Sequence, residues 1–256
     1  MLNIYMKHQI LILLLCFFFW ACNKKQNPSE SKENDQVSHK NEAQIKIEKK
    51  DFKGDDFSLS YSILIEGSEN LKAKIHPLLF SKILGEQYKS LNELENAIQN
   101  KSFKVSDEHC PNASWDFHSN ISQLGSVVSL EMNESSFFCG AHPNSYSSVH
   151  HFHAISGDTI TLNDIFIDLN KITELAENQF CTDNKLKKGN KFYLDAGYES
   201  FGNGFFLSKN YAFDKSGIVF IYNRYEAGPY TLPPFDVKIS FEQLKPFLKP
   251  NNVLGI

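Results

Sequence analysis

A strand that ends in a Gly-Pro corner is the feature that most constrains how this chain folds. The segment reads Gly217-Ile-Val-Phe-Ile-Tyr-Asn-Arg-Tyr-Glu-Ala-Gly-Pro-Tyr230. Residues 218–222 are β-branched or aromatic, a composition that fits a pleated surface buried on at least one face. The Gly-Pro pair breaks the run and leaves Tyr225, Glu226 and Tyr230 on a turn, where binding residues tend to sit on a rigid scaffold. The turn is therefore either a packed corner or part of a binding site.

Further strands and helices are indicated by the spacing of apolar residues along the chain. Strand-like segments lie at 57–63, 113–121, 126–132, 147–155, 205–213 and 235–240, and a short strand with a turn lies at 159–166. Helical spacing covers 71–83, where Pro77 predicts a kink or a late start, 91–98 after a Ser90/Glu93 capping box, 172–180 and 241–248. Residues 189–204 are rich in Gly and Asn and show neither pattern.

The order of these elements predicts the fold class. Helices and mostly sequence-adjacent strands occur in mixed order, which favours an α+β fold over a wound parallel sheet. We expect a mixed, largely antiparallel sheet with a few packed helices, in a single domain or two tightly joined subdomains. The content of 22 Phe and 10 Tyr is ample for a core. A formal net charge of -4 gives no basic field, so nucleic acid is excluded as a partner.

The N-terminus predicts export and lipid anchoring. Lys7 precedes an apolar run at 10–20 that has the length of a signal-peptide core and is short for a transmembrane helix. The run ends Phe19-Trp-Ala-Cys22, which resembles a bacterial lipobox, although Phe19 stands where Leu is usual. We expect a lipoprotein signal peptide over 1–21 and acylation of Cys22, whose several chains would hold the protein on a bilayer. The alternative is an ordinary signal peptide or a single anchor helix.

A tether and two segments are predicted to follow. Residues 23–50 contain no Phe, Trp or Tyr and are dominated by Lys, Glu, Asn, Gln and Ser, which cannot bury enough surface to fold. We therefore predict a disordered tether over 22–50, with a root-mean-square span of about 30 Å. An N-terminal α/β segment at 51–135 and an α+β segment at 136–256 complete the chain. The location expected is the bacterial cell envelope, on the outer membrane if the cell is Gram-negative.

Candidate chemistry is sparse. His142, His150, His151 and His153 lie within twelve positions, and His151 and His153 share one face of a strand. They could begin a zinc site, but no Cys-x-x-Cys or His-Glu-x-x-His spacing completes it, so neither metal nor cofactor is expected and ordinary histidines on a surface strand are favoured.

Catalytic signatures are also weak. The chain has no Gly-x-Ser-x-Gly elbow and no Cys/His arrangement beyond chance. Asp214, Glu226 and Asp236 are the carboxylates that a glycosidase-like pair would draw on, but a chain with 30 acidic residues always offers such sets. Catalytic residues therefore stay unassigned, and an enzyme is the less favoured interpretation.

The cysteines predict one disulfide. Without Cys16 and Cys22, an odd set of Cys110, Cys139 and Cys181 remains for an oxidising compartment. A Cys139–Cys181 disulfide is favoured, since it would join the turn before the histidine strand to a helix. The alternative is Cys110–Cys139, because folding the 113–132 hairpin back brings these two segments near each other.

Three stretches together resemble a known extracytoplasmic domain. They are Cys139-Gly-Ala-His-Pro-Asn144, Ile155-Ser-Gly-Asp-Thr-Ile-Thr-Leu-Asn-Asp-Ile-Phe166 and the segment Gly217–Tyr230, followed by Val237-Lys-Ile-Ser-Phe241 and Leu244-Lys-Pro-Phe-Leu248. In order and spacing they resemble the C-terminal domain of RsiV-type anti-sigma factors, also found beside the catalytic domain of PdaC-type polysaccharide deacetylases. The chain departs from these relatives in having neither a sigma-binding segment nor a deacetylase domain.

The resemblance implies a binding role. In that family the domain is extracytoplasmic and α+β, and in RsiV it is similar in role to a receptor for lysozyme. We expect a module that binds a cell-wall glycan such as peptidoglycan, or a lysozyme-like protein, through His142, Asn144, Tyr225, Glu226, Pro229 and Tyr230. The alternatives are an envelope polysaccharide hydrolase that uses carboxylates near Glu226, and a purely structural lipoprotein.

Overall fold

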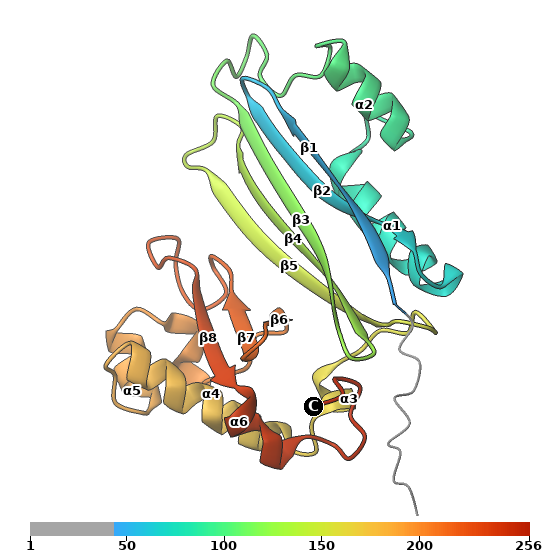
Figure 1. The fold of residues 1–256 in the computed structure, drawn as a ribbon. Coiled ribbons are helices and arrows are strands. Elements are labelled where there is room, and N and C mark those ends of the chain that lie inside the picture. The colour runs from blue at the N-terminus through green and yellow to red at the C-terminus, as the bar shows by residue number, and fades with distance from the viewer. Residues whose placement is uncertain (1–43) are drawn as a thin grey trace, which may run out of the picture. The chain divides into compact units, whose positions relative to one another are not determined.

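Five strands form the larger of two sheets in the computed structural model, which describes residues 44–256 (Figure 1). The strand order is β1-β2-β3-β4-β5, and every neighbouring pair is antiparallel except β2 and β3, which are parallel. The strands are β1 (Lys46–Lys53), β2 (Phe57–Glu66), β3 (Ser114–Leu124), β4 (Val127–Phe137) and β5 (Asn144–His153). The parallel step requires a crossover, and it carries α1 (Glu69–Ile83) and α2 (Leu91–Gln99).

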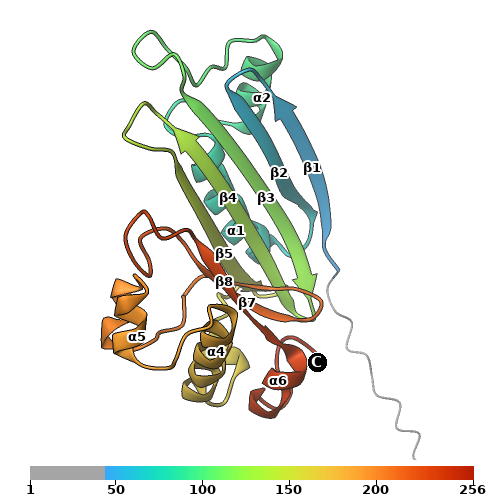
Figure 2. The same cartoon turned by 90° about the vertical axis from the view of Figure 1, so that its left-hand side faces the viewer.

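The two helices cover one face of this sheet (Figures 1 and 2). Alternation along β2 and β3 turns apolar side chains toward them, and Leu59, Tyr61 and Phe117 are almost fully buried there. Helix α1 presents a stripe of leucines and isoleucines at helical spacing to the same core: Leu71, Ile75, Leu79 and Ile83. The opposite face of the sheet carries the polar residues of the alternation, and the second sheet lies on that side.

The second sheet and its helices form a separate core. Its strands are β6 (Tyr211–Phe213), β7 (Gly217–Tyr222) and β8 (Phe235–Ser240), all antiparallel. The helices are α3 (Leu162–Ile165), α4 (Leu169–Asp183), α5 (Asn190–Asp195) and α6 (Phe241–Leu244), with 3₁₀ turns at Glu199–Asn203 and Lys245–Phe247. Aromatic rings fill this core, with Phe180 of α4 against Phe201 and Phe235. No helix of residues 44–256 has the length and apolar character needed to cross a bilayer.

Two asparagine side chains join the sheets by capping the free edge of β5. Asn223 accepts from the Ser147 backbone N–H through Oδ1 at 2.8 Å and donates to the Ser147 carbonyl through Nδ2 at 2.9 Å. Asn210 accepts from the Val149 N–H and donates to the Ser147 carbonyl, both at 2.8 Å. These amides take the place of a sixth strand, because each offers the donor and acceptor that a neighbouring backbone would supply.

A buried histidine strengthens the same junction. His151 is 3% exposed, and its ring stacks on Tyr211 with centroids 4.4 Å apart. Nε2 lies 2.8 Å from the Tyr211 carbonyl, which only accepts, so Nε2 carries the proton and Nδ1 accepts from the Ser129 hydroxyl, also at 2.8 Å. Burial lowers the pKa of His151 to about 4, so the ring is neutral at physiological pH.

The predicted α+β class with a largely antiparallel sheet is confirmed. Four details of the prediction are wrong. The tether does not reach residue 50, because Lys46–Lys53 pairs with β2 as strand β1. The cores divide after β5, near residue 155, and not at 135/136, because β4 pairs with β5 along its length. Within 205–213 only Tyr211–Phe213 is a strand, and 162–165 is a short helix with a Thr161/Asp164 capping box.

The predicted signal peptide, the predicted acylation site Cys22 and most of the predicted tether lie outside the described residues.

We predict that Asn223→Ala lowers the free energy of unfolding by about 1–2 kcal/mol, because it leaves the half-buried Ser147 N–H without its partner. Urea denaturation of the full chain measures this loss. The control is Asn112→Ala, which changes an exposed loop asparagine and should alter the free energy by less than about 0.5 kcal/mol. Equal effects of the two substitutions would contradict the capping role of Asn223.

We also predict that the free energy of unfolding falls by about 2 kcal/mol between pH 7 and pH 5 through His151 alone. The pKa of His151 in the folded state lies below the unfolded value of 6.5. Below pH 6.5 this histidine is therefore protonated in the unfolded chain but stays neutral in the folded chain. The loss develops as the pH falls from 6.5 and is complete near pH 4. Denaturation at both pH values should show a shallower pH dependence in His151→Gln, which keeps a donor but does not titrate. The same slope in both proteins would exclude His151 as the cause.

Candidate functional site

The loop between β4 and β5 meets the turn that follows β7. Tyr230 Oη donates to the Pro143 carbonyl at 3.0 Å, and Tyr225 Oη lies 3.2 Å from His142 Nε2. We call the group of His142, Arg224, Tyr225 and Tyr230 the aromatic corner. Three of the residues predicted from the sequence are therefore in mutual contact, although His142 and Tyr225 are 83 positions apart.

Both faces of the Tyr230 ring are occupied within the aromatic corner. The His142 ring stacks on it with centroids 3.6 Å apart, and the Arg224 guanidinium lies 4.4 Å from its centroid. At these distances the two groups leave no room for each other on one face, so they lie on opposite faces. Arg224 also donates to the Tyr230 carbonyl at 2.8 Å. Tyr230 therefore holds the corner together and offers no free face to a ligand, contrary to the expected stacking role.

Tyr225 is the aromatic residue of the corner that faces solvent. Its side chain is 59% exposed and its backbone has a φ of +67°. A left-handed conformation costs a tyrosine roughly 1–2 kcal/mol, since Cβ approaches the following carbonyl. Such strain concentrates at functional sites, where the surrounding structure enforces it. Here the strained backbone presents a largely exposed ring whose hydroxyl is bonded to His142.

Glu226 is a turn-forming residue. Its Oε2 accepts from the Asn223 backbone N–H, its own N–H donates to the Asn223 carbonyl at 3.1 Å, and Ser208 Oγ lies 3.4 Å from Oε1. The carboxylate thus closes the turn that aims Asn223 at β5. Asn144 begins β5 and Pro229 precedes Tyr230, and both are exposed beside the aromatic corner.

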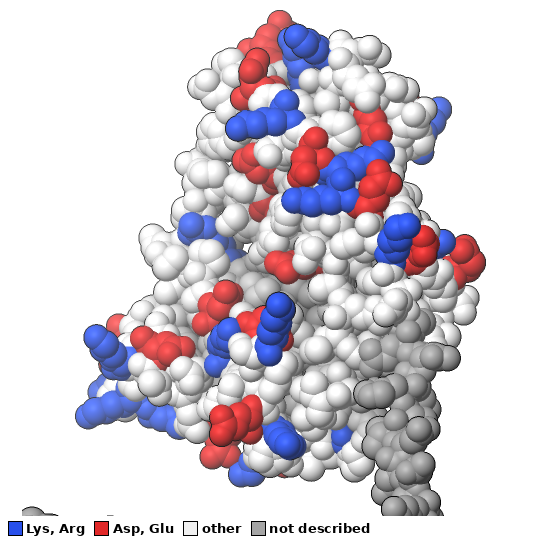
Figure 3. Space-filling view, in the orientation of Figure 1, with Lys and Arg blue, Asp and Glu red and all other residues white. Residues whose placement is uncertain are grey.

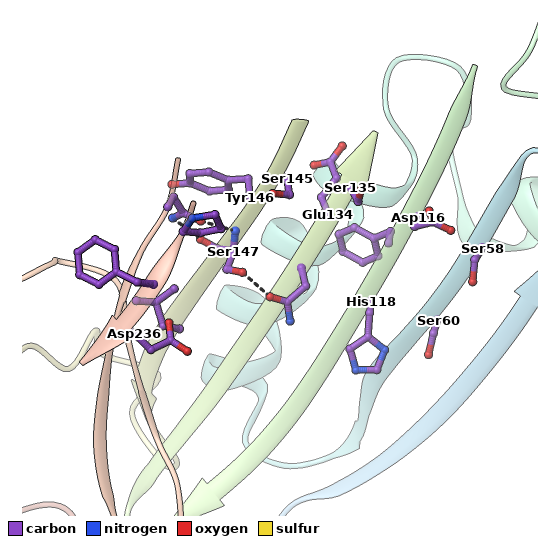
Figure 4. A pocket seen from close by; sticks show the side chains of 16 residues that line it. Ser58, Ser60, Asp116, His118, Glu134, Ser135, Ser145, Tyr146, Ser147 and Asp236 are labelled. Atoms are coloured by element: carbon purple, nitrogen blue, oxygen red, sulfur yellow. Dashed lines mark hydrogen bonds between the residues drawn. The ribbon is translucent and has the colours of Figure 1, made fainter. Parts of the chain in front are cut away.

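A groove of about 550 Å³ begins next to the aromatic corner and was not predicted from the sequence. Its floor is the polar face of β2–β5 and one wall is the small sheet (Figure 4). Serines predominate in the lining: Ser58, Ser60, Ser135, Ser145 and Ser147. Asn133 accepts from the Ser147 hydroxyl at 2.6 Å and donates to Glu131 at 2.9 Å, which orders the floor. Alternating serines in β2 were the available signal, but they equally fit an ordinary solvated strand.

The ionisable side chains of the groove are mainly acidic. Asp116 and His118 project from β3, and Asp236 projects from β8 across from them (Figure 4). Partial burial and the nearby Glu131 carboxylate raise the pKa of Asp236. Glu134 also lines the groove, where it accepts from the Trp115 indole at 3.1 Å.

The three carboxylates considered for catalysis do not converge. Asp214 sits in the turn between β6 and β7, where its bond with Lys238 holds its pKa well below the usual range. Glu226 is bonded within its own turn, where it accepts from the Asn223 N–H. Of the three carboxylates, only Asp236 lines the groove. Asp236 pairs with Ile221 at the far end of β7 from Gly217, to which Asp214 is bonded.

The histidine cluster gives no metal site among residues 44–256, where no three His, Cys, Asp or Glu side chains are placed to hold an ion. Both ring nitrogens of His151 are used in the sheet junction. His153 Nδ1 accepts from the Ile155 and Ser156 backbones, each at 3.3 Å. The strand is not the surface strand that was favoured, because His151 lies under the small sheet.

The disulfide joins Cys110 to Cys139, so the favoured Cys139–Cys181 pairing is wrong. Ser114 and Phe137 are partners in the β3–β4 ladder, and this brings the flanking cysteines together. Cys181 is a buried free thiol on the core face of α4, 3.4 Å from Tyr193 Oη. The disulfide anchors the loop that carries His142 to the end of the large sheet.

Comparison with known proteins identifies a domain of unknown function. Residues 163–242 match the family model described as "Protein of unknown function (DUF3298)", so the chain carries a DUF3298 domain over most of the second core. No curated protein matches the chain.

Two crystal structures have a similar fold. One is a member of the DUF3298 family from Bacteroides fragilis, with 20% identity, a TM-score of 0.63, and coverage of 84% of this chain and 98% of that one. The other is a DUF3298 family protein from Pseudomonas aeruginosa PAO1, with 15% identity, a TM-score of 0.55, and coverage of 82% and 95%. These likenesses establish a shared fold that extends well beyond residues 163–242.

We predict that peptide mapping without reductant recovers a Cys110–Cys139 cross-link, with Cys181 alkylated only after denaturation. Cys139→Ser should lower the free energy of unfolding by about 3 kcal/mol, because the cross-link closes a loop with a sequence separation of 29. Cys181→Ala, the control, should leave the cross-link intact. A Cys139–Cys181 peptide would contradict the structure.

Proposed function

We propose that this protein is a lipid-anchored module of the bacterial cell envelope that binds cell-wall glycan in the groove beside the aromatic corner. The observation that carries the proposal is an open, hydroxyl-rich groove whose lining includes Asn223, two positions before the exposed Tyr225 that is held in a strained conformation. A cleft of about 300–1,000 Å³ with several polar groups is typical of a small-ligand site. The amphipathic ring of Tyr225 suits the apolar faces of sugars.

Anchoring through acylated Cys22 and an extracytoplasmic location are part of the same proposal. They are supported by the lipobox-like sequence at 19–22 and by the resemblance to the C-terminal domain of RsiV-type anti-sigma factors and PdaC-type deacetylases. The Cys110–Cys139 disulfide agrees with an oxidising compartment.

Two other functions remain as alternatives. A lysozyme-like protein as the partner would bind the Tyr and Arg side chains of the aromatic corner, residue types that are enriched among the strongest contributors to protein interfaces.

The second alternative, an envelope polysaccharide hydrolase, is favoured by one observation, the raised pKa of Asp236 beside Glu131, which suits a general acid. A hydrolase would release reducing ends from peptidoglycan, and Asp236→Asn would abolish the release. If the full chain binds glycan without such release, the binding function stands.

We predict that the full chain co-sediments with purified peptidoglycan and that Tyr225→Asn weakens this binding about 3- to 10-fold, the value of one aromatic contact. Asparagine tolerates a positive φ, so the free energy of unfolding should be unchanged or higher. The control is Phe192→Ala, which removes a 40% exposed ring on α5 and should bind as the unchanged protein does. Absence of binding to both peptidoglycan and lysozyme, or an equal loss in the two variants, would exclude this site.

A further inference from the structure

The charge of the groove is unbalanced, unlike that of the surface around it. Its lining contains the carboxylates Asp116, Glu134 and Asp236 and the imidazole of His118, but neither lysine nor arginine. Lysines lie elsewhere in the described part of the chain. In Figure 3, Lys and Arg side chains gather beside α5, and others alternate with acidic side chains over the large sheet. The groove therefore combines ligand-sized space with an excess of negative charge.

Several carboxylates outside the groove have lysine partners. Lys238 lies beside Asp214, Lys50 is 2.9 Å from Glu95, and Lys188 is 2.8 Å from Glu177. Asp236 instead has a second carboxylate, Glu131, as the neighbour that acts on its charge. Like charges near each other repel, and a cation bound in the groove beside Asp236 would reduce the repulsion.

The remaining lining suits a hydroxyl-rich ligand. Five serine hydroxyls and the amides of Asn133 and Asn223 line the groove, though Asn223 is committed to β5. Serine hydroxyls both donate and accept, which matches the hydroxyls of a sugar ring. Pro234 and Phe235 add an apolar strip on the wall of the small sheet.

We propose that the groove binds an amino sugar with a free amine, such as a de-N-acetylated glucosamine unit of a glycan, with its ammonium group near Asp236, the carboxylate that lines the groove from β8. The inference rests on the proposed glycan-binding function and specifies its ligand. Asp116 provides additional negative charge, and the serines on β2, β4 and β5 meet the hydroxyls of the sugar. An N-acetylated unit has no charge to offer these carboxylates, so it binds more weakly.

The test is calorimetric titration of the full chain at pH 6 with two probes, the glucosamine tetrasaccharide and the N-acetylglucosamine tetrasaccharide. We expect at least tenfold tighter binding of the free amine, and a smaller preference at 0.5 M salt. Asp236→Asn should abolish the preference, because the carboxylate proposed to meet the ammonium group is lost. Asp195→Asn, which removes an exposed carboxylate at the end of α5, should preserve it.

The outcomes separate this inference from the function on which it rests. Equal or tighter binding of the acetylated probe, or a preference that survives in Asp236→Asn, overturns the amine site and leaves glycan binding in place. No binding of either probe or of peptidoglycan overturns both. Spermidine binding as tightly as the amino sugar would show recognition of charge without sugar and would also overturn the proposal.

Discussion

The bonds from Asn210 and Asn223 to the edge of β5 determine how the two halves of the fold meet. A bare edge strand exposes a row of unpaired N–H and C=O groups. Here two amide side chains satisfy Ser147 and Val149, so the small sheet is held against β5 without continuing its ladder. Side-chain bonds leave the two sheets as separate layers, and the polar face of β2–β5 stays open beside the wall formed by β7 and β8 (Figure 4). The groove follows from this mode of joining.

The aromatic corner depends on the same contact. Asn223 begins the turn, and Glu226 closes it by accepting from the Asn223 N–H, so the residue that caps β5 also fixes the path of Tyr225. Tyr230 is held between Arg224 and His142, and the disulfide fixes the loop from which His142 comes. Tyr225 is bonded to His142 through its hydroxyl, but most of its ring is exposed. The ring of Tyr225 is directed outward at a conformational cost, which is the arrangement expected of a residue that meets a ligand.

Features that local sequence patterns encode, such as strands and spaced motifs, could be predicted from the sequence. Features that depend on packing between distant segments could not. Apolar alternation located β2 to β5, β7 and β8, and the spaced motifs brought His142, Tyr225 and Tyr230 together. Strand β1 was assigned to the tether because Lys46–Lys53 is mostly charged, yet an edge strand with one neighbour needs little apolar surface. Cys181 looked available for a disulfide, but Ile172, Ala176 and Phe180 show that it continues the buried stripe of α4. The groove had no sequence signature, since serine and asparagine also mark solvated strands.

Glu226 and Asp236 differ in how much of their charge is used by the protein itself. Glu226 lies in the conspicuous motif, but backbone and hydroxyl donors satisfy it, so little of its charge is left for a ligand. Asp236 lies in an unremarkable alternating strand, and its pairing with Ile221 places it at the groove. There its influential neighbour is the like-charged Glu131, which disfavours ionisation where Lys238 favours it at Asp214. Three acids in or beside one small sheet therefore differ in chemistry because of neighbours 3 to 105 positions away in sequence, and our proposal assigns recognition to Asp236, which has a like-charged neighbour.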